Sequence, residues 1–389
     1  MISLVVPTYN ERGNVDALVE RAGAALASTK QPFELIIVDD NSPDGTADAV
    51  RALQGSRPWL RVLMRTEERG LSTAVMAGWN IAQGDVLGCM DADLQHPPEV
   101  LSKLVETMGT THADIVVASR HVRGGGVSDW SLARRFVSWT ATLLATMILP
   151  GTLGEVRDPM SGFFLLRRDV IREAELRPRG YKILLEVLAK GSHTQVKEVP
   201  FVFEERAEGG SKIGTSIIWD YLIHLGRISF ETGEAAKIGK FALVGLAGAV
   251  VNLLVYRWLA GISLSVWAAA AIAASVAIVN NFVWNEMFTF PEAHRASPSW
   301  GAMLRRCGMF ALISGAGLLL NVAVVEFLVA ILHLPWLPGV SAGIVIAGAW
   351  NFFANANLTW PPDPKKRLAR ADEVLDMPKS SQPAIEKIK

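Results

Sequence analysis

The sequence predicts an α/β domain with a doubly wound, Rossmann-like sheet, followed by interfacial amphipathic helices and an all-α transmembrane domain of four helices. Two observations lead to this prediction. In the first 120 residues, short apolar runs alternate with segments of helical periodicity, which is typical of a parallel sheet covered by helices on both faces. Only seven of the 76 charged residues lie between positions 241 and 360, so this part has the composition of helices embedded in lipid.

The predicted strands are short and apolar, and a helical segment follows each of the first four. The strands are 2–6, 35–38, 62–64, 86–90 and 115–118, and the helices are 15–26, 46–53, 73–81 and 99–108. In doubly wound sheets, ligands bind at the carboxyl ends of the strands. The polar motifs of this domain directly follow predicted strands, so we expect them to meet at one edge of the sheet.

The bulk composition bears on partners and location. The formal net charge at pH 7 is zero, so overall charge gives no reason to expect a nucleic-acid partner. Cys89 and Cys307 lie in apolar surroundings, and we interpret them as small buried side chains. The chain begins with a strand-like run instead of a signal peptide, so we expect the amino-terminal domain to be cytoplasmic.

Two later segments, about 128–150 and 211–234, predict amphipathic helices at the membrane interface. Apolar and aromatic side chains recur in them at helical spacing, with polar residues between. Tryptophan-rich helices of this kind lie flat on a membrane. The alternative is that both helices pack on the core of the soluble domain.

Four apolar segments follow, each near the ~20 residues that cross a bilayer. They are about 241–259, 265–284, 308–332 and 337–358. Between them, Lys and Arg occur only in the middle loop, as Arg295, Arg305 and Arg306, and more follow the last span. The positive-inside rule then predicts that both termini and the middle loop are cytoplasmic. We expect a multi-pass cell-membrane protein with a catalytic domain at 1–235, a membrane domain at 236–360 and a disordered cytoplasmic tail at 361–389.

The membrane domain contains an internal repeat. Residues 241–252 are similar to 310–321, and the pattern of residues 281–289 recurs at 351–359. The domain is therefore a duplicated helical hairpin whose copies share one topology. Asparagine in a membrane helix needs a partner. We expect interhelical hydrogen bonds, with a polar path as the alternative, at Asn252, Asn281, Asn285, Asn321, Asn351 and Asn355.

The motif with the clearest chemistry is an Asp-x-Asp-x-Gln series after the predicted strand 86–90. In an extended chain, residues two apart point to the same side, so Asp91, Asp93 and Gln95 would face one ion. Mg²⁺ and Mn²⁺ prefer carboxylate oxygens, and phosphate and water complete the coordination. We therefore predict that these three residues bind Mg²⁺ or Mn²⁺ and that the metal neutralises a diphosphate leaving group.

A second acidic pair, Asp39 and Asp40, follows the strand 35–38, and the polar run 7–11 follows the first strand. The pair is suited to hold the base or ribose of a nucleotide, and Tyr9 is suited to stack on a base. The alternative for the residues after the pair is a turn at 44–45 with Thr46 as a helix cap. Both interpretations are compatible, because the cap lies after the acidic pair.

These motifs together resemble the family 2 glycosyltransferases with a GT-A fold, over residues 1 to about 235. The motifs are, in order, 7–11, 38–46, 70–78 and 91–95. The branch that the chain resembles consists of dolichyl- or polyprenyl-phosphate mannose synthases, and the membrane domain resembles the GtrA-like four-helix domain. The resemblance implies inverting transfer of mannose from GDP-mannose to a dolichyl or polyprenyl phosphate, for glycoconjugate synthesis.

The resemblance also implies roles for individual residues. Those of the donor site are Pro7, Tyr9, Glu11, Asp39, Asp40, Asp91, Ala92 and Asp93. Arg120, Arg134 and Ser138 would bind the acceptor phosphate, with the donor diphosphate as an alternative for Arg120. The family has a small residue followed by asparagine after this serine, whereas here Ala141 is followed by Thr142. Arg206 and Lys212 match a loop that closes over the donor phosphates. The catalytic set is Asp91, Asp93, Arg120, Arg134, Arg206 and Lys212. Asp158 matches a segment beside the sugar, and Glu186 either orients a sugar hydroxyl or is an ordinary helix carboxylate.

Several alternatives remain at this stage. In the first alternative, the donor is UDP-glucose or another nucleotide sugar instead of GDP-mannose. A processive polysaccharide synthase is disfavoured, because its Gln-x-x-Arg-Trp motif does not occur after residue 150. An alternative function of a different class is that the membrane domain acts as a lipid-linked-sugar flippase or as a scaffold. The membrane domain is also a candidate surface for forming homo-oligomers.

Overall fold

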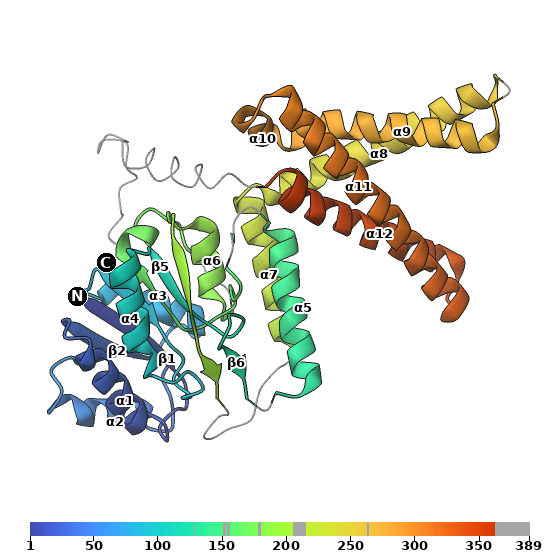
Figure 1. The fold of residues 1–389 in the computed structure, drawn as a ribbon. Helices are drawn as coiled ribbons and strands as arrows, with labels where there is room; N and C mark the ends of the chain where they lie inside the picture. The colour runs from blue at the N-terminus through green and yellow to red at the C-terminus, as the bar shows by residue number, and fades with distance from the viewer. Residues whose placement is uncertain are drawn as a thin grey trace. The chain divides into compact units, whose positions relative to one another are not determined.

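The computed structural model describes residues 1–128, 130–150, 153, 156–177, 180–204, 215–262 and 264–361 (Figure 1). The chain divides into two compact units. Met1–Leu144 and Thr152–Ile228 belong to the first, and Ala145–Gly151 and Ser229–Asp363 to the second. The tail predicted at 361–389 lies, apart from its first residue, outside the described residues.

A seven-stranded sheet forms the centre of the first unit, in the order β3-β2-β1-β4-β7-β5-β8. Its strands are β1 (Ile2–Thr8), β2 (Phe33–Asp39), β3 (Leu60–Met64), β4 (Val86–Cys89), β5 (Ile115–Ser119), β7 (Phe164–Arg167) and β8 (Val196–Pro200). The five predicted strands are all present. Strand β7, which was not predicted, runs antiparallel to β4 and β5, and all other neighbours are parallel. A separate two-stranded sheet pairs β6 (Gly126–Val127) with β9 (Val202–Phe203).

Helices cover both faces of the sheet, which confirms the doubly wound prediction. They are α1 (Val15–Ser28), α2 (Thr46–Gln54), α3 (Leu71–Ile81), α4 (Val100–Thr111), α6 (Ile183–Lys190) and the 3₁₀ helix η1 (Arg168–Ile171). Because side chains alternate along a strand, Ile2, Leu4 and Val6 share one core with α1, α2 and α4. Val5 points to the opposite face, where Gly78 of α3 packs directly against it.

Two amphipathic helices, α5 (Leu132–Ile148) and α7 (Thr215–Glu231), lie within the ranges predicted for them and side by side (Figure 1). The hydroxyl of Tyr221 donates a hydrogen bond to the carbonyl of Ala141 at 2.5 Å and so joins them. Both helices expose large apolar side chains, namely Leu132, Phe136, Val137 and Trp139 of α5 and Ile218, Trp219, Leu222 and Ile223 of α7. The interfacial location of these helices stays a prediction.

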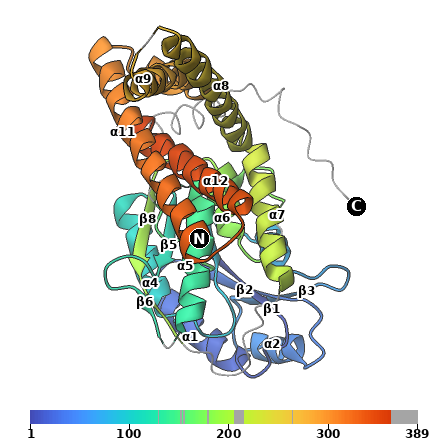
Figure 2. The same ribbon diagram turned by 90° about the vertical axis from the view of Figure 1, so that its right-hand side faces the viewer.

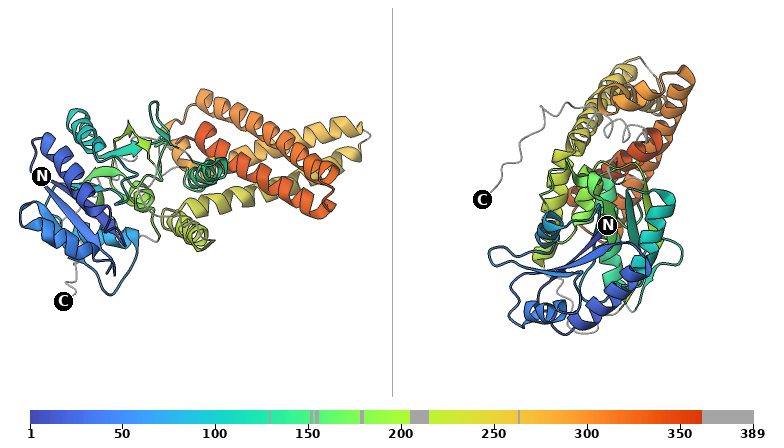
Figure 3. Two further views of the ribbon diagram at one scale, coloured as in Figure 1. Left: turned by 90° about the horizontal axis from the view of Figure 1, so that it is seen from below. Right: turned by 90° about the vertical axis from the view of Figure 1, so that its left-hand side faces the viewer.

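The second unit contains four helices that are long and apolar enough to cross a membrane, as predicted. They span Glu234–Ala260, Val266–Thr289, Trp300–Ile331 and Trp336–Thr359. These spans comprise α8 (Glu234–Ala260), α9 (Val266–Trp284) with the π-helix η2 (Asn285–Thr289), α11 (Trp300–Val325) with η3 (Glu326–Ile331), and α12 (Trp336–Ala354) with η4 (Asn355–Thr359). The short α10 (Pro291–Ala296) connects the second span to the third. The views in Figures 1, 2 and 3 show α8 paired with α9, and α11 paired with α12.

The sequence repeat corresponds to a repeated local structure. In η2, the Asn285 side chain donates to the Asn281 carbonyl at 2.9 Å and accepts from the hydroxyl of Thr289 at 2.8 Å. Asn355 makes the equivalent two bonds in η4, at 2.8 and 2.7 Å. The prediction of interhelical bonds is therefore wrong for Asn285 and Asn355. Their amides bond within their own helix, where a π-helical turn interrupts the regular backbone ladder.

Asn281 and Asn351 contact the neighbouring helix in a different way. Each amide lies against a glycine, Gly248 for Asn281 and Gly317 for Asn351, so closely that an added Cβ would overlap it. Small residues at such positions allow two membrane helices to approach closely. The glycines and asparagines that recur in the two halves of the sequence thus hold each hairpin together.

An aromatic cluster and a buried ion pair join the two hairpins. The cluster consists of Phe282, Phe290, Phe310, Phe352 and Trp360. Beside it, Nε of Arg306 lies 3.1 Å from both carboxylate oxygens of Glu286, and the indole of Trp360 donates to the same carboxylate at 2.6 Å. Arg306 is buried, so the positive-inside argument for the middle loop depends on its other two arginines.

Candidate active site

A cleft of about 1020 Å³ opens at the carboxyl edge of the sheet in the first unit. Most of the predicted site residues line it, namely Pro7, Tyr9, Glu11, Asp40, Asp91, Ala92, Asp93, Gln95, Arg120, Arg134 and Ser138. Asp39 is not among the lining residues, and Arg206 and Lys212 lie outside the described residues. The parallel strands β1 and β4 end together at this edge, so residues distant in the sequence meet there.

The carboxylate of Asp39 organises the loop at the end of β2. It is buried and accepts hydrogen bonds from the Thr8 hydroxyl at 3.0 Å and from the backbone and hydroxyl of Ser42 at 2.9 and 2.6 Å. Asp39 thus holds in place the backbone next to Asp40, whose side chain lines the cleft. Its own contact with a nucleotide stays a prediction.

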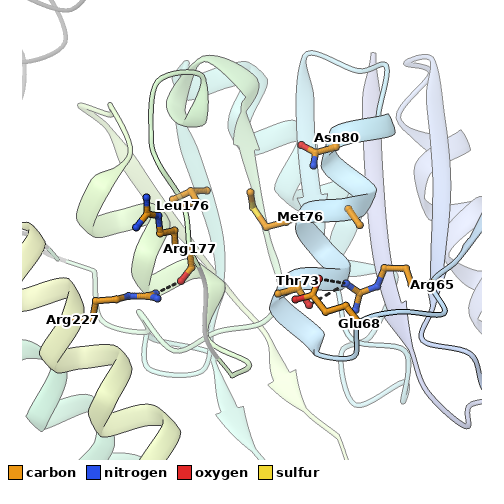
Figure 4. A pocket seen from close by; sticks show the side chains of 9 residues that line it. Arg65, Glu68, Thr73, Met76, Asn80, Leu176, Arg177 and Arg227 are labelled. Atoms are coloured by element: carbon orange, nitrogen blue, oxygen red, sulfur yellow. Dashed lines mark hydrogen bonds and ion pairs between the residues drawn. The ribbon is translucent and has the colours of Figure 1, made fainter. Parts of the chain in front are cut away.

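Asp40 is held by an arginine that the sequence analysis did not single out. Nε of Arg65 donates to the Asp40 carboxylate at 2.7 Å, and the amide of Gly70 donates to it at 2.8 Å. Gly70 has φ +149°, which lies in the region that favours glycine. Arg65 also binds Thr73 at 3.0 Å, on the wall of a second cavity of about 480 Å³ (Figure 4). The Asp40 carboxylate is therefore fixed by the loop before α3.

The first polar motif contacts the loop that precedes α2. The amide of Glu11 donates to the hydroxyl of Thr46 at 3.1 Å, and that hydroxyl donates to Asp44 at 2.6 Å. The prediction that Thr46 caps the helix is wrong, because Thr46 is the first residue of α2 and Asp44 accepts its amide at 3.0 Å. The ring of Tyr9 is exposed, and the guanidinium of Arg69 lies 4.9 Å from its centre.

Asp91, Asp93 and Gln95 all line the cleft, at what we call its floor, but the chain does not follow the extended path predicted for them. Strand β4 ends at Cys89, and Leu94 has a positive φ of 59°, so the chain bends and strand alternation does not apply. Gln95 is fixed from two sides, because its amide side chain donates to the Glu204 carbonyl at 2.9 Å and its backbone amide to Asp93 at 3.2 Å. Two carboxylates and an amide are oxygen donors that suit Mg²⁺ or Mn²⁺ together with phosphate.

Two further residues shape this floor. Gly162 lies against Asp91, and an added Cβ would be 3.0 Å from its carboxylate. His96 is buried among Phe163, Phe201 and Phe203, with ring centres 5.3 to 5.4 Å away.

Burial lowers the pKa of His96 to about 3, so its imidazole is neutral. Its Nδ1 accepts a hydrogen bond from the Asp91 amide at 3.3 Å. The 3.5 Å approach to the Asp91 carboxylate is therefore not an ion pair.

Arg120 is bound by a buried carboxylate. Its guanidinium makes two hydrogen bonds to Asp158, at 2.8 and 2.7 Å, and its amide makes a third at 3.0 Å. Burial raises the pKa of Asp158, but the hydrogen bonds and charge of Arg120 outweigh this and hold the pKa below its ordinary value. Asp158, which matches a family segment beside the sugar, is thus paired with Arg120 in the structure.

Arg134 also lines the cleft, and it lies in the first turn of α5. Its guanidinium carbon is 4.2 Å from the ring centre of Trp130, and its amide donates to the Ser131 hydroxyl at 3.3 Å. Ser138 follows one turn later on the same side of the helix and also lines the cleft.

Lys182 is a cleft cation that the sequence analysis did not assign. Its Nζ donates to the Met160 carbonyl at 2.8 Å, and burial, with Arg120 nearby, lowers its pKa to about 8. Glu186 does not line the cleft. It is buried and accepts from Lys190 at 2.6 Å and from the Arg177 amide at 2.7 Å, which agrees with an ordinary helix carboxylate.

The same part of the first unit joins α6 to α7. The guanidinium of Arg227 in α7 binds the carbonyl of Arg177 (Figure 4). It also lies 3.6 Å from the Glu186 carboxylate. This contact fixes α7, which forms one wall of the cleft, to the α/β domain.

Comparison with known proteins agrees with this architecture. Residues 3–174 match the family described as glycosyl transferase family 2, and residues 240–360 match the GtrA/DPMS transmembrane domain. A dolichol-phosphate mannosyltransferase of Pyrococcus furiosus is 38% identical over 360 residues, which cover 92% of this chain and 99% of that protein. One of Saccharomyces cerevisiae is 41% identical, covering 57% and 85%. An undecaprenyl-phosphate mannosyltransferase of Micrococcus luteus is 32% identical, covering 60% and 98%.

The chain is a glycosyltransferase with an α/β catalytic fold and a helical membrane domain. Within family 2 it belongs to the dolichyl- and polyprenyl-phosphate mannose synthase branch that carries a GtrA-like domain, which confirms the resemblance seen in the sequence. The matching transmembrane domain and the four apolar helices make it a membrane protein.

Proposed function

We propose that this enzyme transfers mannose from GDP-mannose to the phosphate of a dolichol or related polyprenol, with inversion at the anomeric carbon. The observation that carries the proposal is the near full-length similarity to a dolichol-phosphate mannosyltransferase. A cleft that is lined by a carboxylate motif and by Arg120 and Arg134 supports it. We further propose that residues 1–235 form the catalytic domain on the cytoplasmic side and that 236–360 form the membrane domain.

On the donor side, Asp91, Asp93 and Gln95 would hold Mg²⁺ or Mn²⁺, which neutralises the charge of the departing diphosphate. The nucleotide would lie along the remaining donor residues, Pro7, Tyr9, Glu11, Asp39, Asp40 and Ala92. Arg65 keeps the carboxylate of Asp40 in place, and His96 holds the backbone of Asp91. Arg206 and Lys212 would close over the phosphates.

On the acceptor side, Arg134, Ser138 and Arg120 would bind the lipid phosphate, because arginine and hydroxyl groups donate to phosphate oxygens. From there the cleft continues between α5 and α7. Its lining becomes apolar, with Phe136, Val137, Ala141, Leu144, Ile218 and Leu222. An apolar groove that starts at a phosphate site suits a polyprenyl chain.

The reaction needs no general base, because the acceptor phosphate is already an anion near neutral pH. Its oxygen attacks the anomeric carbon, the bond from that carbon to the donor diphosphate breaks, and the electron pair leaves with the nucleoside diphosphate. In-line attack on an α-linked donor gives a β-linked product. The positive side chains of Arg134 and Lys182, which both line the cleft, would stabilise the negative charge of the phosphate groups, and the cleft supplies proximity.

The test is an assay of the purified full-length chain with a short polyprenyl phosphate, Mn²⁺ and a panel of labelled nucleotide sugars. We expect GDP-mannose to give β-mannosyl phosphate lipid, identified by the anomeric coupling in NMR. Preferential transfer from UDP-glucose would replace the proposed donor. No lipid-linked product with any donor would refute the proposed function.

A further inference from the structure

Two arginines of the cleft meet at one indole ring. Arg134 lies over the face of Trp130, with its guanidinium carbon 4.2 Å from the ring centre. The guanidinium carbon of Arg120 is 5.7 Å from the same ring. Phe203 packs against Trp130 at 5.4 Å with an interplanar angle of 78°. All four side chains line the cleft, so this arrangement forms part of its wall.

The two arginines are fixed by different means. Arg120 is held by the buried carboxylate of Asp158, which also compensates its charge. Arg134 is in the first turn of α5, and its guanidinium carbon is close enough to the Trp130 ring for a cation–π contact. A flexible arginine loses less conformational freedom on binding phosphate when a rigid ring already holds it in place.

The contacts of Trp130 in the cleft involve its ring and not its N–H group. Both arginines and Phe203 approach the π system. The indole Nε1 is buried, and in the part of the chain that the structure describes no acceptor lies within hydrogen-bond distance of it. A phenylalanine at this position would therefore keep an aromatic ring face for Arg134 to contact, whereas a leucine would keep only an apolar side chain.

We propose that Trp130 is a positioning residue of the acceptor site, whose ring face holds the guanidinium of Arg134 in place for the lipid phosphate. The inference rests on the proposed function, because it requires a phosphate acceptor. Among the described residues, the ring contacts of Trp130 are with Arg120, Arg134 and Phe203, and none of these belongs to the carboxylate motif. Its effect should therefore fall on binding of the acceptor and not on binding of the donor.

The experiment measures steady-state kinetics of the full-length enzyme in detergent, with polyprenyl phosphate and labelled GDP-mannose varied in turn. In Trp130→Leu we expect the KM for the lipid phosphate to rise about threefold to thirtyfold, the range for loss of one cation–π contact. The KM for GDP-mannose should stay within twofold of wild type. Trp130→Phe should restore most of the lost affinity for the lipid phosphate. Trp219→Leu, on α7 and outside the cleft lining, is the matched control and should behave as wild type.

A double-mutant cycle shows whether Trp130 acts through Arg134. In an Arg134→Ala background, Trp130→Leu should add less than twofold to the KM for the lipid phosphate. Full additivity would overturn the inference. If Trp130→Leu does not fold, Arg134→Lys is the substitute. It keeps the charge but loses the planar guanidinium that lies over the Trp130 ring, so its KM for the lipid phosphate should rise, and a KM equal to wild type would overturn the inference.

The wild-type arm separates this inference from the proposed function. Absence of transfer to lipid phosphate by the wild-type enzyme would refute both. Wild-type transfer together with unchanged kinetics in Trp130→Leu would refute the role of Trp130 alone.

Discussion

Replacing Asp158 by asparagine isolates the buried ion pair that fixes Arg120. The Asp158 side chain is fully buried, that of Arg120 is 8% exposed, and three hydrogen bonds of 2.7 to 3.0 Å join the two residues. Asparagine keeps the volume and one acceptor oxygen, but it leaves the guanidinium charge uncompensated away from water. Breaking a buried pair in this way costs about 3 kcal/mol or more. For a unit of this size, that corresponds to a fall in Tm of about 6–12 °C.

The assay is thermal unfolding of the full-length protein in detergent, followed over a range of pH. Because the pKa of Asp158 is lowered in the folded state, its stabilising contribution is complete above the ordinary carboxyl pKa near 4. It is lost as the pH falls through the lowered folded-state pKa. The difference in Tm between wild type and Asp158→Asn should therefore be full at pH 7 and should shrink below about pH 4.

An exposed ion pair provides the matched control. Asp169 and Arg172 are paired with side chains 71% and 65% exposed, so Asp169→Asn should leave the Tm unchanged. An Asp158→Asn variant with the Tm of wild type at pH 7 would refute the reasoning. So would a difference in Tm that stays constant from pH 7 to pH 3.

Three further predictions concern the floor of the cleft, the sheet and the membrane domain. Chelation of divalent ions should abolish transfer, and added Mn²⁺ should restore it. Asp91→Asn should lower kcat at least about 100-fold. Full activity in EDTA would exclude a requirement for the metal. Gly78→Ala should lower the stability by about 1–3 kcal/mol in denaturant unfolding, because its Cβ would lie 2.8 Å from Cγ2 of Val5; unchanged stability would show that α3 can shift. Glu286→Gln should lower the Tm in detergent, because it leaves the charge of Arg306 buried and unpaired; an unchanged Tm would show that the ion pair does not stabilise the junction of the hairpins.

The cleft shows which kinds of site residue a sequence reveals. Asp91 and Asp93 could be found because they directly follow an apolar strand, and such ends meet at the ligand-binding edge of a doubly wound sheet. The pairing roles of Arg65 and Asp158 could not be found in the same way. Their partners, Asp40 and Arg120, lie 25 and 38 residues away in the sequence, and no local periodicity encodes such pairs.

By itself, the sequence determined the alternation of strands and helices, the four membrane-spanning segments and the positions of the acidic motifs, because hydrophobic periodicity and local charge are properties of neighbouring residues. The tertiary structure alone decided which side chains pair. It placed the unpredicted strand β7 between β4 and β5. It also bent the chain at Leu94, just before Gln95, and buried His96 next to Asp91. Such pairings depend on sheet order and packing, which bring together residues that the chain itself keeps apart.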